Sequence, residues 1–169
     1  MRATVLIVLS GLTLGAAACT TVETPVELAP GVTTSAAPAP VADHDWFYFR
    51  DGDEARLVYG LAESDDLRLG FDCGQGSGRL MLSAIGGPDA RPEIHIEAED
   101  LTARFPAQSE PSQLHEGVFL TAEAAANTAV FQRFRRIGWI TLWQDGERQV
   151  FVAQPESVPN IERFFAFCG

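Results

Sequence analysis

The sequence predicts a single α+β domain in which two helices cover a twisted, antiparallel sheet of about seven to eight strands. Three observations support this prediction. Apolar residues alternate with period two along much of residues 43–169, as in half-buried strands. Two other segments carry apolar residues at helical spacing. Two cysteines, Cys73 and Cys168, fall on the predicted inner faces of a strand and of the last helix.

The first 42 residues are predicted to lie outside this domain. Residues 1–18 carry one positive charge, then an apolar run and small residues, which is the pattern of a secretory signal peptide. The stretch from Ala3 to Ala18 is 16 residues long, shorter than the roughly 20 apolar residues that span a bilayer. Residues 19–42 are rich in Thr, Ala and Pro, which is typical of a tether, and residues 43–169 form the folded domain.

Cys19 directly follows the small residues at the end of the signal. This arrangement resembles the lipobox of bacterial lipoproteins, in which the cysteine becomes the acylated N-terminus. Ordinary signal cleavage is the alternative, because residues 16–18 also form an A-x-A site. Thr20, rather than Asp, follows the cysteine, which resembles lipoproteins of the outer membrane. We expect a palmitate-type anchor on Cys19 that holds the protein at the outer membrane, facing the periplasm; an unacylated chain would be periplasmic or secreted.

The candidate strands follow one another with short turns. The period-two pattern predicts them at residues 46–50, 55–59, 67–73, 79–85, 93–98, 101–105, 139–143 and 148–152, and residues 117–121 are a candidate for an additional strand. Gly-rich segments at 74–78 and 86–89 are the expected turns. Asp145-Gly146 between two alternating runs indicates a β-hairpin.

Two helices complete the predicted domain. The first is capped by Asn127 or Thr128, ends at Gly138 and has an apolar face of Val130, Phe131, Phe134 and Ile137. The second is capped by Ser157 or Asn160 and has an apolar face of Ile161, Phe164, Phe165 and Cys168.

The three cysteines divide into one anchor and one pair. If Cys19 carries lipid, Cys73 and Cys168 remain to form a disulfide in an oxidising compartment. Such a bond would attach the C-terminal helix to the sheet across 95 residues, which stabilises a fold by about 4–5 kcal/mol on the chain-entropy model. Two buried free thiols are the alternative.

The charge of the chain excludes several functions. All 12 basic residues are arginine, and without Arg2 the remaining 11 stand against 23 acidic residues, a net charge of −12. Such a surface repels nucleic acid, so no nucleic-acid partner is expected. The absence of lysine excludes Schiff-base chemistry and a P-loop lysine.

Three polar motifs favour structural interpretations. Gly74, Gly76 and Gly78 follow a strand as a dinucleotide loop would, but another strand follows them, which favours a hairpin turn. The row of Glu93, His95, Glu97 and Glu99 is predicted to be a solvated strand face, with metal binding as the alternative. Residues 43–45 are expected to be hydrated, and no metal or cofactor is expected.

No catalytic set is evident in the sequence. A Gly-x-Ser-x-Gly motif is absent, and nothing in the sequence brings His44, His95 or His115 together with a serine and an aspartate. Trp46, Trp139 and Trp143 are candidates for an exposed binding patch, although aromatic residues on sheets more often lie in the core.

The order of elements resembles two groups of bacterial proteins. The segment 67–73 with its Gly-rich turn, the helix ending at Gly138, the Asp-Gly hairpin and the terminal Phe164–Cys168 are similar to small secreted proteins of uncharacterised function. The layout is more distantly similar to VasI-like periplasmic proteins associated with type VI secretion, although Asp72 stands where that pattern has arginine. Neither resemblance implies a functional residue.

These observations favour a cell-envelope lipoprotein with a non-enzymatic binding or structural domain. Its partners would be the membrane, through the lipid anchor, and another envelope protein. An envelope hydrolase and a type VI secretion accessory factor are the alternatives.

Overall fold

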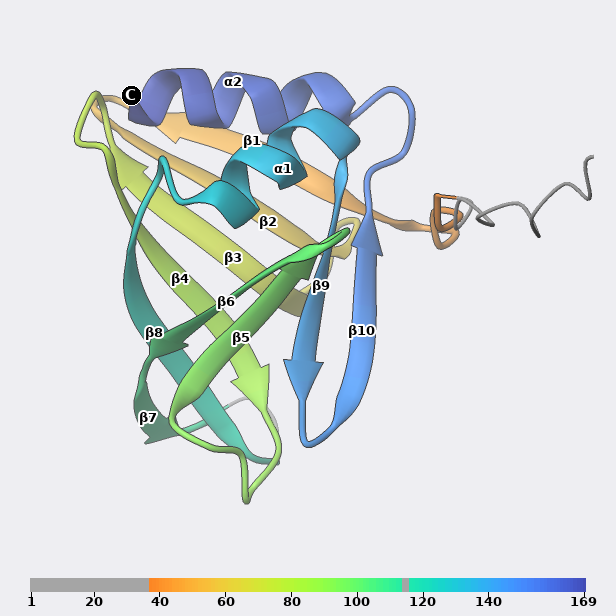
Figure 1. The fold of residues 1–169 in the computed structure, drawn as a ribbon, viewed down its shortest axis with the longest axis vertical. Coiled ribbons are helices and arrows are strands. Elements are labelled where there is room, and N and C mark those ends of the chain that lie inside the picture. Colours follow the sequence, from red (N-terminus) through yellow and green to blue (C-terminus); the bar gives the residue numbers. More distant parts are fainter. Residues whose placement is uncertain (1–36, 114–115) are drawn as a thin grey trace, which may run out of the picture. The chain divides into compact units, whose positions relative to one another are not determined.

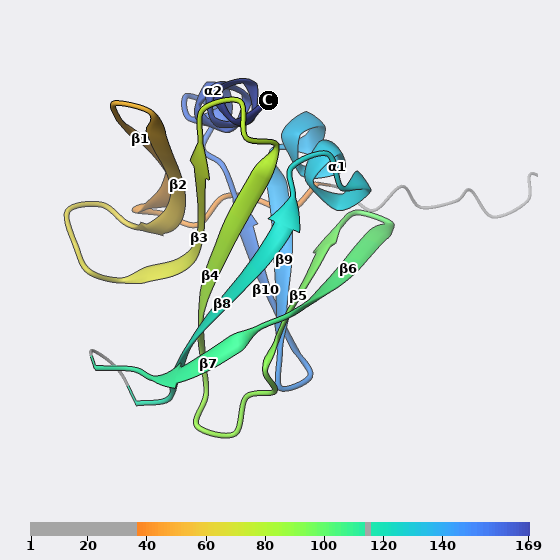
Figure 2. The ribbon, with the colours of Figure 1, turned by 90° about the vertical axis from the view of Figure 1, so that its left-hand side faces the viewer.

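The folded domain is built from two antiparallel sheets and two helices (Figures 1 and 2). The structure, a computed structural model, describes residues 37–113 and 116–169. The predicted signal, Cys19 and most of the tether lie outside these ranges. The six-stranded sheet has the order β1 (His44–Asp51), β2 (Glu54–Leu61), β3 (Leu67–Gly74), β4 (Arg79–Gly86), β8 (Val118–Ala125) and β7 (Gln108–Pro111). The four-stranded sheet has the order β10 (Glu147–Val152), β9 (Trp139–Gln144), β5 (Glu93–Ala98) and β6 (Leu101–Pro106).

The predicted α+β class, the antiparallel pairing and the two helices are confirmed. The described residues contain ten strands in two sheets, whereas the sequence predicted one sheet of seven or eight strands. The difference arises because β6 continues through Ala107 into β7, and the chain thereby moves from the four-stranded to the six-stranded sheet. All four residues of β7 are exposed, so this strand lacks the alternation that reveals a half-buried strand.

Both helices lie at the same end of the strands (Figures 1 and 2). α1 (Ala129–Ile137) packs on β5 and β6, and α2 (Val158–Cys168) packs on β1, β2 and β3. α1 ends where the sequence predicts, because Gly138 adopts the left-handed conformation with φ of 77° and its amide donates to the Phe134 carbonyl at 2.8 Å. Thr128 and Ser157 occupy the N-cap positions, but neither side chain bonds to its helix.

One continuous hydrophobic core includes residues from both sheets and both helices. Its centre is aromatic: the indole of Trp46 lies 5.6 Å from the ring of Phe71 and 4.9 Å from that of Phe134, measured between centroids. Phe164 and Phe165 bring the apolar face of α2 onto the same cluster. Burial of large aromatic rings is the main force that holds the helices on the sheets.

The predicted disulfide joins Cys73 on β3 to Cys168 at the end of α2, with their Cα atoms 5.8 Å apart. Backbone hydrogen bonds support the same junction. The amide of Gly76 donates to the Phe167 carbonyl at 2.9 Å, and that of Gly78 donates to the Cys168 carbonyl at 2.8 Å. The Gly-rich turn between β3 and β4 therefore receives the C-terminal end of α2, and β4 follows it directly.

Candidate binding groove

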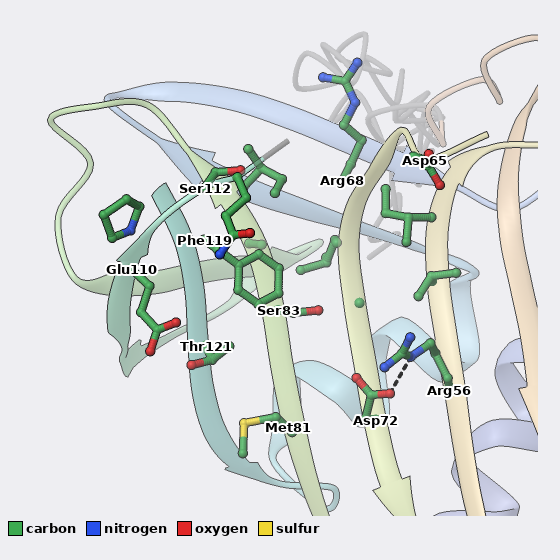
Figure 3. A pocket seen from close by; sticks show the side chains of 18 residues that line it. Arg56, Asp65, Arg68, Asp72, Met81, Ser83, Glu110, Ser112, Phe119 and Thr121 are labelled. Atoms are coloured by element: carbon green, nitrogen blue, oxygen red, sulfur yellow. Dashed lines mark hydrogen bonds and ion pairs between the residues drawn. The ribbon is translucent and has the colours of Figure 1, made fainter. Parts of the chain in front are cut away.

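The outer face of the six-stranded sheet is hollow. A cavity of about 690 Å³ lies against β2, β3, β4, β7 and β8, and a second hollow of about 1050 Å³ continues from it toward β1. The two hollows share five lining residues: Arg56, Val58, Leu67, Asp72 and Met81. We call their union the sheet groove. Figure 3 shows Glu110 and Phe119 on one side of the first cavity and the Arg56–Asp72 pair on the other.

Small side chains create the floor of the sheet groove. Gly70 on β3 pairs with Ser83 on β4, so neither strand carries a large side chain at this position. A Cβ atom on Gly70 would lie 2.5 Å from the Ser83 Oγ and 3.4 Å from a methyl group of Val58. The described backbone gives Gly70 no positive φ, so conformational freedom does not explain this glycine. The close approach of the Ser83 hydroxyl and of Val58 accounts for the glycine at this position.

The walls of the sheet groove expose apolar side chains. Four of the six exposed large hydrophobic residues in the described part of the chain line it: Phe49, Leu67, Met81 and Phe119, with exposures of 40–57%. Single exposed apolar residues are common on protein surfaces, but their concentration in one concave region is typical of an interaction site.

Three of the four groove arginines are paired with neighbouring carboxylates. Arg56 pairs with Asp72 at 2.5 Å, and Arg68 pairs with Asp66 at 2.7 Å. Arg79 pairs with Glu123 in the same way. These pairs are partly exposed, so each contributes less than about 1 kcal/mol to stability.

Four of the six groove carboxylates, Asp51, Glu54, Asp65 and Glu110, form no ion pair within residues 37–113 and 116–169. Of these, Asp65 and Glu110 line the first cavity. Over the whole groove, four arginines face six carboxylates, an excess of two negative charges. The carboxylates are Asp51, Glu54, Asp65, Asp72, Glu110 and Glu123, and the arginines are Arg50, Arg56, Arg68 and Arg79.

The predicted tryptophan patch is not formed. Trp46 is fully buried in the core, which makes the hypothesis wrong for this residue, because its strand turns the indole toward α1 and β3. Trp139 and Trp143 are half-buried on β9. Trp143 is covered on its ring by Arg148 at 5.2 Å, stacks on His95 at 5.8 Å and donates to the Glu97 carboxylate at 2.9 Å.

The row of Glu93, His95 and Glu97 lies on the outer face of β5 and is held by local bonds. Arg104 binds Glu93 at 2.6 Å, and Arg148 binds Glu97 at 2.5 Å. Burial, with the charge of Arg104 second, lowers the pKa of His95, which favours the neutral imidazole. In the described residues, no group of three or more His, Cys, Asp or Glu side chains is placed to hold a metal ion.

Among the described residues, neither His44 nor His95 contacts both a serine and an aspartate as a catalytic triad would require. His44 lies 3.9 Å from Asp66, and His95 bonds to Thr102 at 2.7 Å; His115 lies outside the described residues. The expectation that residues 43–45 are merely hydrated is wrong for Asp45. Its carboxylate accepts bonds from the Gln154 amide at 3.0 Å and from the Ser157 hydroxyl, and thereby ties β1 to the loop before α2.

The comparisons with known proteins add no identification. No protein-family model, no curated protein and no solved structure matches this chain. The resemblances noted from the order of elements therefore stay predictions. In the described ranges, neither helix has the length and hydropathy to cross a membrane.

Proposed function

We propose that this chain is a cell-envelope lipoprotein that binds a partner protein in the sheet groove. Cys19 carries the lipid, which anchors the protein at the outer membrane. The observation that carries the binding role is the hollow outer face of the six-stranded sheet, where the exposed side chains of Leu67, Met81 and Phe119 line a cavity of about 690 Å³. The lining of the groove offers apolar side chains, carboxylates and paired arginines, which suits recognition.

The length of the segment before the domain suits this role. Residues 20–42 can span at most about 80 Å, at about 3.5 Å for each residue. A domain attached to a membrane by such a segment can reach partners that lie within that distance. Its net negative charge of −12 after removal of the signal keeps it away from anionic headgroups.

Membrane attachment is tested by Cys19→Ala in the organism's own envelope. The variant lacks the acylated thiol, so it should be released from membranes that retain the unaltered protein. Fractionation followed by detection of the folded domain measures the distribution. Equal membrane retention of the two proteins would contradict the lipid anchor.

The groove is tested by site-specific photo-crosslinking in living cells. A photoreactive amino acid replaces Met81 in the groove or, as a control, Val158 at the start of α2. These two side chains have nearly equal exposure, 41% and 42%. We expect discrete crosslinked products from position 81 and none from position 158. Identical patterns from both positions, or no product from position 81, would contradict binding in the groove.

A further inference from the structure

We infer that the sheet groove binds an extended, positively charged segment of a partner protein, with apolar side chains in its middle and Lys or Arg at its ends. This inference rests on the proposed function and names the chemistry of the partner. It follows from the length of the groove, the small residues of its floor and its unbalanced charge.

The groove runs along the strands, which favours an extended chain. Its lining on β4 reaches from Arg79 to Ile85, six residues apart. At about 3.4 Å for each residue of an antiparallel strand, this distance is about 20 Å. A segment of about six extended residues has the same length. Four lining residues of β4, Arg79, Met81, Ser83 and Ile85, occupy alternate positions and therefore point to the same face of the sheet; Leu80 and Ala84 of the same strand also line the groove.

The floor and walls supply the apolar part of the site. Gly70 and Ser83 line the first cavity without a large side chain of their own, and the Ser83 Oγ and a methyl group of Val58 lie over Gly70. Met81, Leu67 and Phe119 stand around this position with 40–41% of their surface exposed. Covering these side chains removes apolar area from water at roughly 25 cal/mol per Å², the main favourable term for such a contact.

The unpaired carboxylates of the groove favour basic residues at the ends of the bound segment. Arg56 and Arg68 are each engaged with an aspartate of this chain. Asp65 in the β2–β3 loop and Glu110 on β7 lie near the Ile85 end of the groove, and Asp51 and Glu54 lie near its Arg79 end. None of these four carboxylates has an ion pair within the described residues. With two negative charges in excess, the groove attracts a cationic segment and repels an anionic one.

The same charge argues against occupation by the chain's own preceding segment. Residues 20–36 contain Glu23 and Glu27 and no basic residue. Their entry would add negative charge to a groove that already has an excess of it. A separate partner with basic residues therefore fits better than the tether.

Calorimetric titration with two synthetic peptides tests the inference. The full-length protein in nonionic detergent is titrated with acetyl-KTLTVTLTK-amide or with its glutamate twin, acetyl-ETLTVTLTE-amide, after subtraction of the heat from detergent alone. We expect the lysine peptide to bind about tenfold more tightly than its twin at low salt, with a smaller difference at 0.3 M salt because of screening. Equal affinities would overturn the inferred charge of the segment.

Two sets of matched variants assign the effect to the groove. Asp65→Asn/Glu110→Gln should weaken the lysine peptide about fivefold, as expected for two exposed ion pairs. The control Asp89→Asn/Glu156→Gln removes the same charge from exposed positions outside the groove and should leave the affinity unchanged. A similar loss in both double variants would overturn the role of the two groove carboxylates. Ser83→Leu, which fills the floor, should prevent binding, and its melting temperature shows whether the domain is still folded.

Crosslinking and calorimetry distinguish a failure of groove binding from a failure of the inferred segment chemistry. If neither peptide binds while position 81 still gives crosslinked products in cells, the inference of an extended cationic segment is wrong but groove binding stands. If position 81 gives no crosslinked product, the proposed function itself is wrong.

Discussion

The disulfide between Cys73 and Cys168 should provide a large part of the domain's stability. It closes a loop with a sequence separation of 95. The chain-entropy relation gives about 4.7 kcal/mol at 25 °C for a loop of this length. Both cysteines are buried, with exposures of 7% and 0%, so the reduced thiols would remain in the core and the main effect falls on the unfolded chain. With the unfolding entropy of a domain of about 130 residues, a loss of about 4.7 kcal/mol lowers the melting temperature by about 17 °C.

Equilibrium unfolding in guanidinium chloride measures this contribution. Fluorescence of the buried Trp46 reports unfolding of the core, and the titration is made with and without a reducing agent. Cys73→Ala/Cys168→Ala is the control, because a reducing agent should not change its unfolding curve. A loss of less than about 1 kcal/mol, both on reduction and in the double variant, would refute the reasoning from loop closure.

Three further substitutions test the packing and electrostatics. Gly60→Ala places a Cβ about 2.3 Å from the Asp66 carbonyl oxygen and should lower the free energy of unfolding by about 1–3 kcal/mol in urea titrations; an unchanged midpoint would contradict the close approach. Phe134→Ala opens a cavity in the aromatic centre of the core and should cost about 3–5 kcal/mol in the same assay, whereas a cost below about 1 kcal/mol would contradict its central position. The hydrogen bond from Arg135 lowers the pKa of Glu162, so the pair stabilises the fold above the ordinary pKa of Glu and loses this effect as the pH falls through the lowered value. Glu162→Gln should therefore be less stable than the unaltered protein at pH 7, by less than about 1 kcal/mol because the pair is exposed, and equally stable near pH 2; a difference that persists at pH 2 would contradict this origin.

Local patterns in the sequence were sufficient for most of the fold. Leu69, Phe71 and Cys73 occupy alternate positions, and all three are buried as period two requires. The hairpin at Asp145-Gly146 forms with positive φ at both residues, the conformation that this pair of residues favours. The disulfide followed from two independent periodicities, one of a strand and one of a helix.

The sheet groove could not be predicted because it depends on pairing between strands. Gly70 and Ser83 are 13 residues apart, and only the register of β3 with β4 places them opposite each other. In hindsight, the sequence contains two signals of the groove. Gly70 interrupts a strand, and Met81 and Phe119 are apolar residues on the polar faces of their strands.

The incorrect predictions for Trp46 and Asp45 have the same physical origin. Trp46 lies near the start of β1, directly after the polar residues His44 and Asp45, but the packing of α1 and β3 around it removes it from solvent. Asp45 resembles an ordinary hydrated residue until the fold brings the loop before α2, more than 100 residues later, into hydrogen-bonding distance. In both cases, contacts between distant segments override the local pattern.

The methyl resonance of Met81 offers the most direct measurement of groove binding. The chain has two methionines, and Met1 belongs to the predicted signal, so methyl-labelled methionine places a reporter in the groove. Substitution Met81→Leu assigns its signal. We predict that titration with the lysine-ended peptide shifts this resonance progressively and that Ser83→Leu prevents the shift. A resonance that stays in place while the peptide binds, as measured by calorimetry, would show that binding occurs elsewhere and would contradict the account.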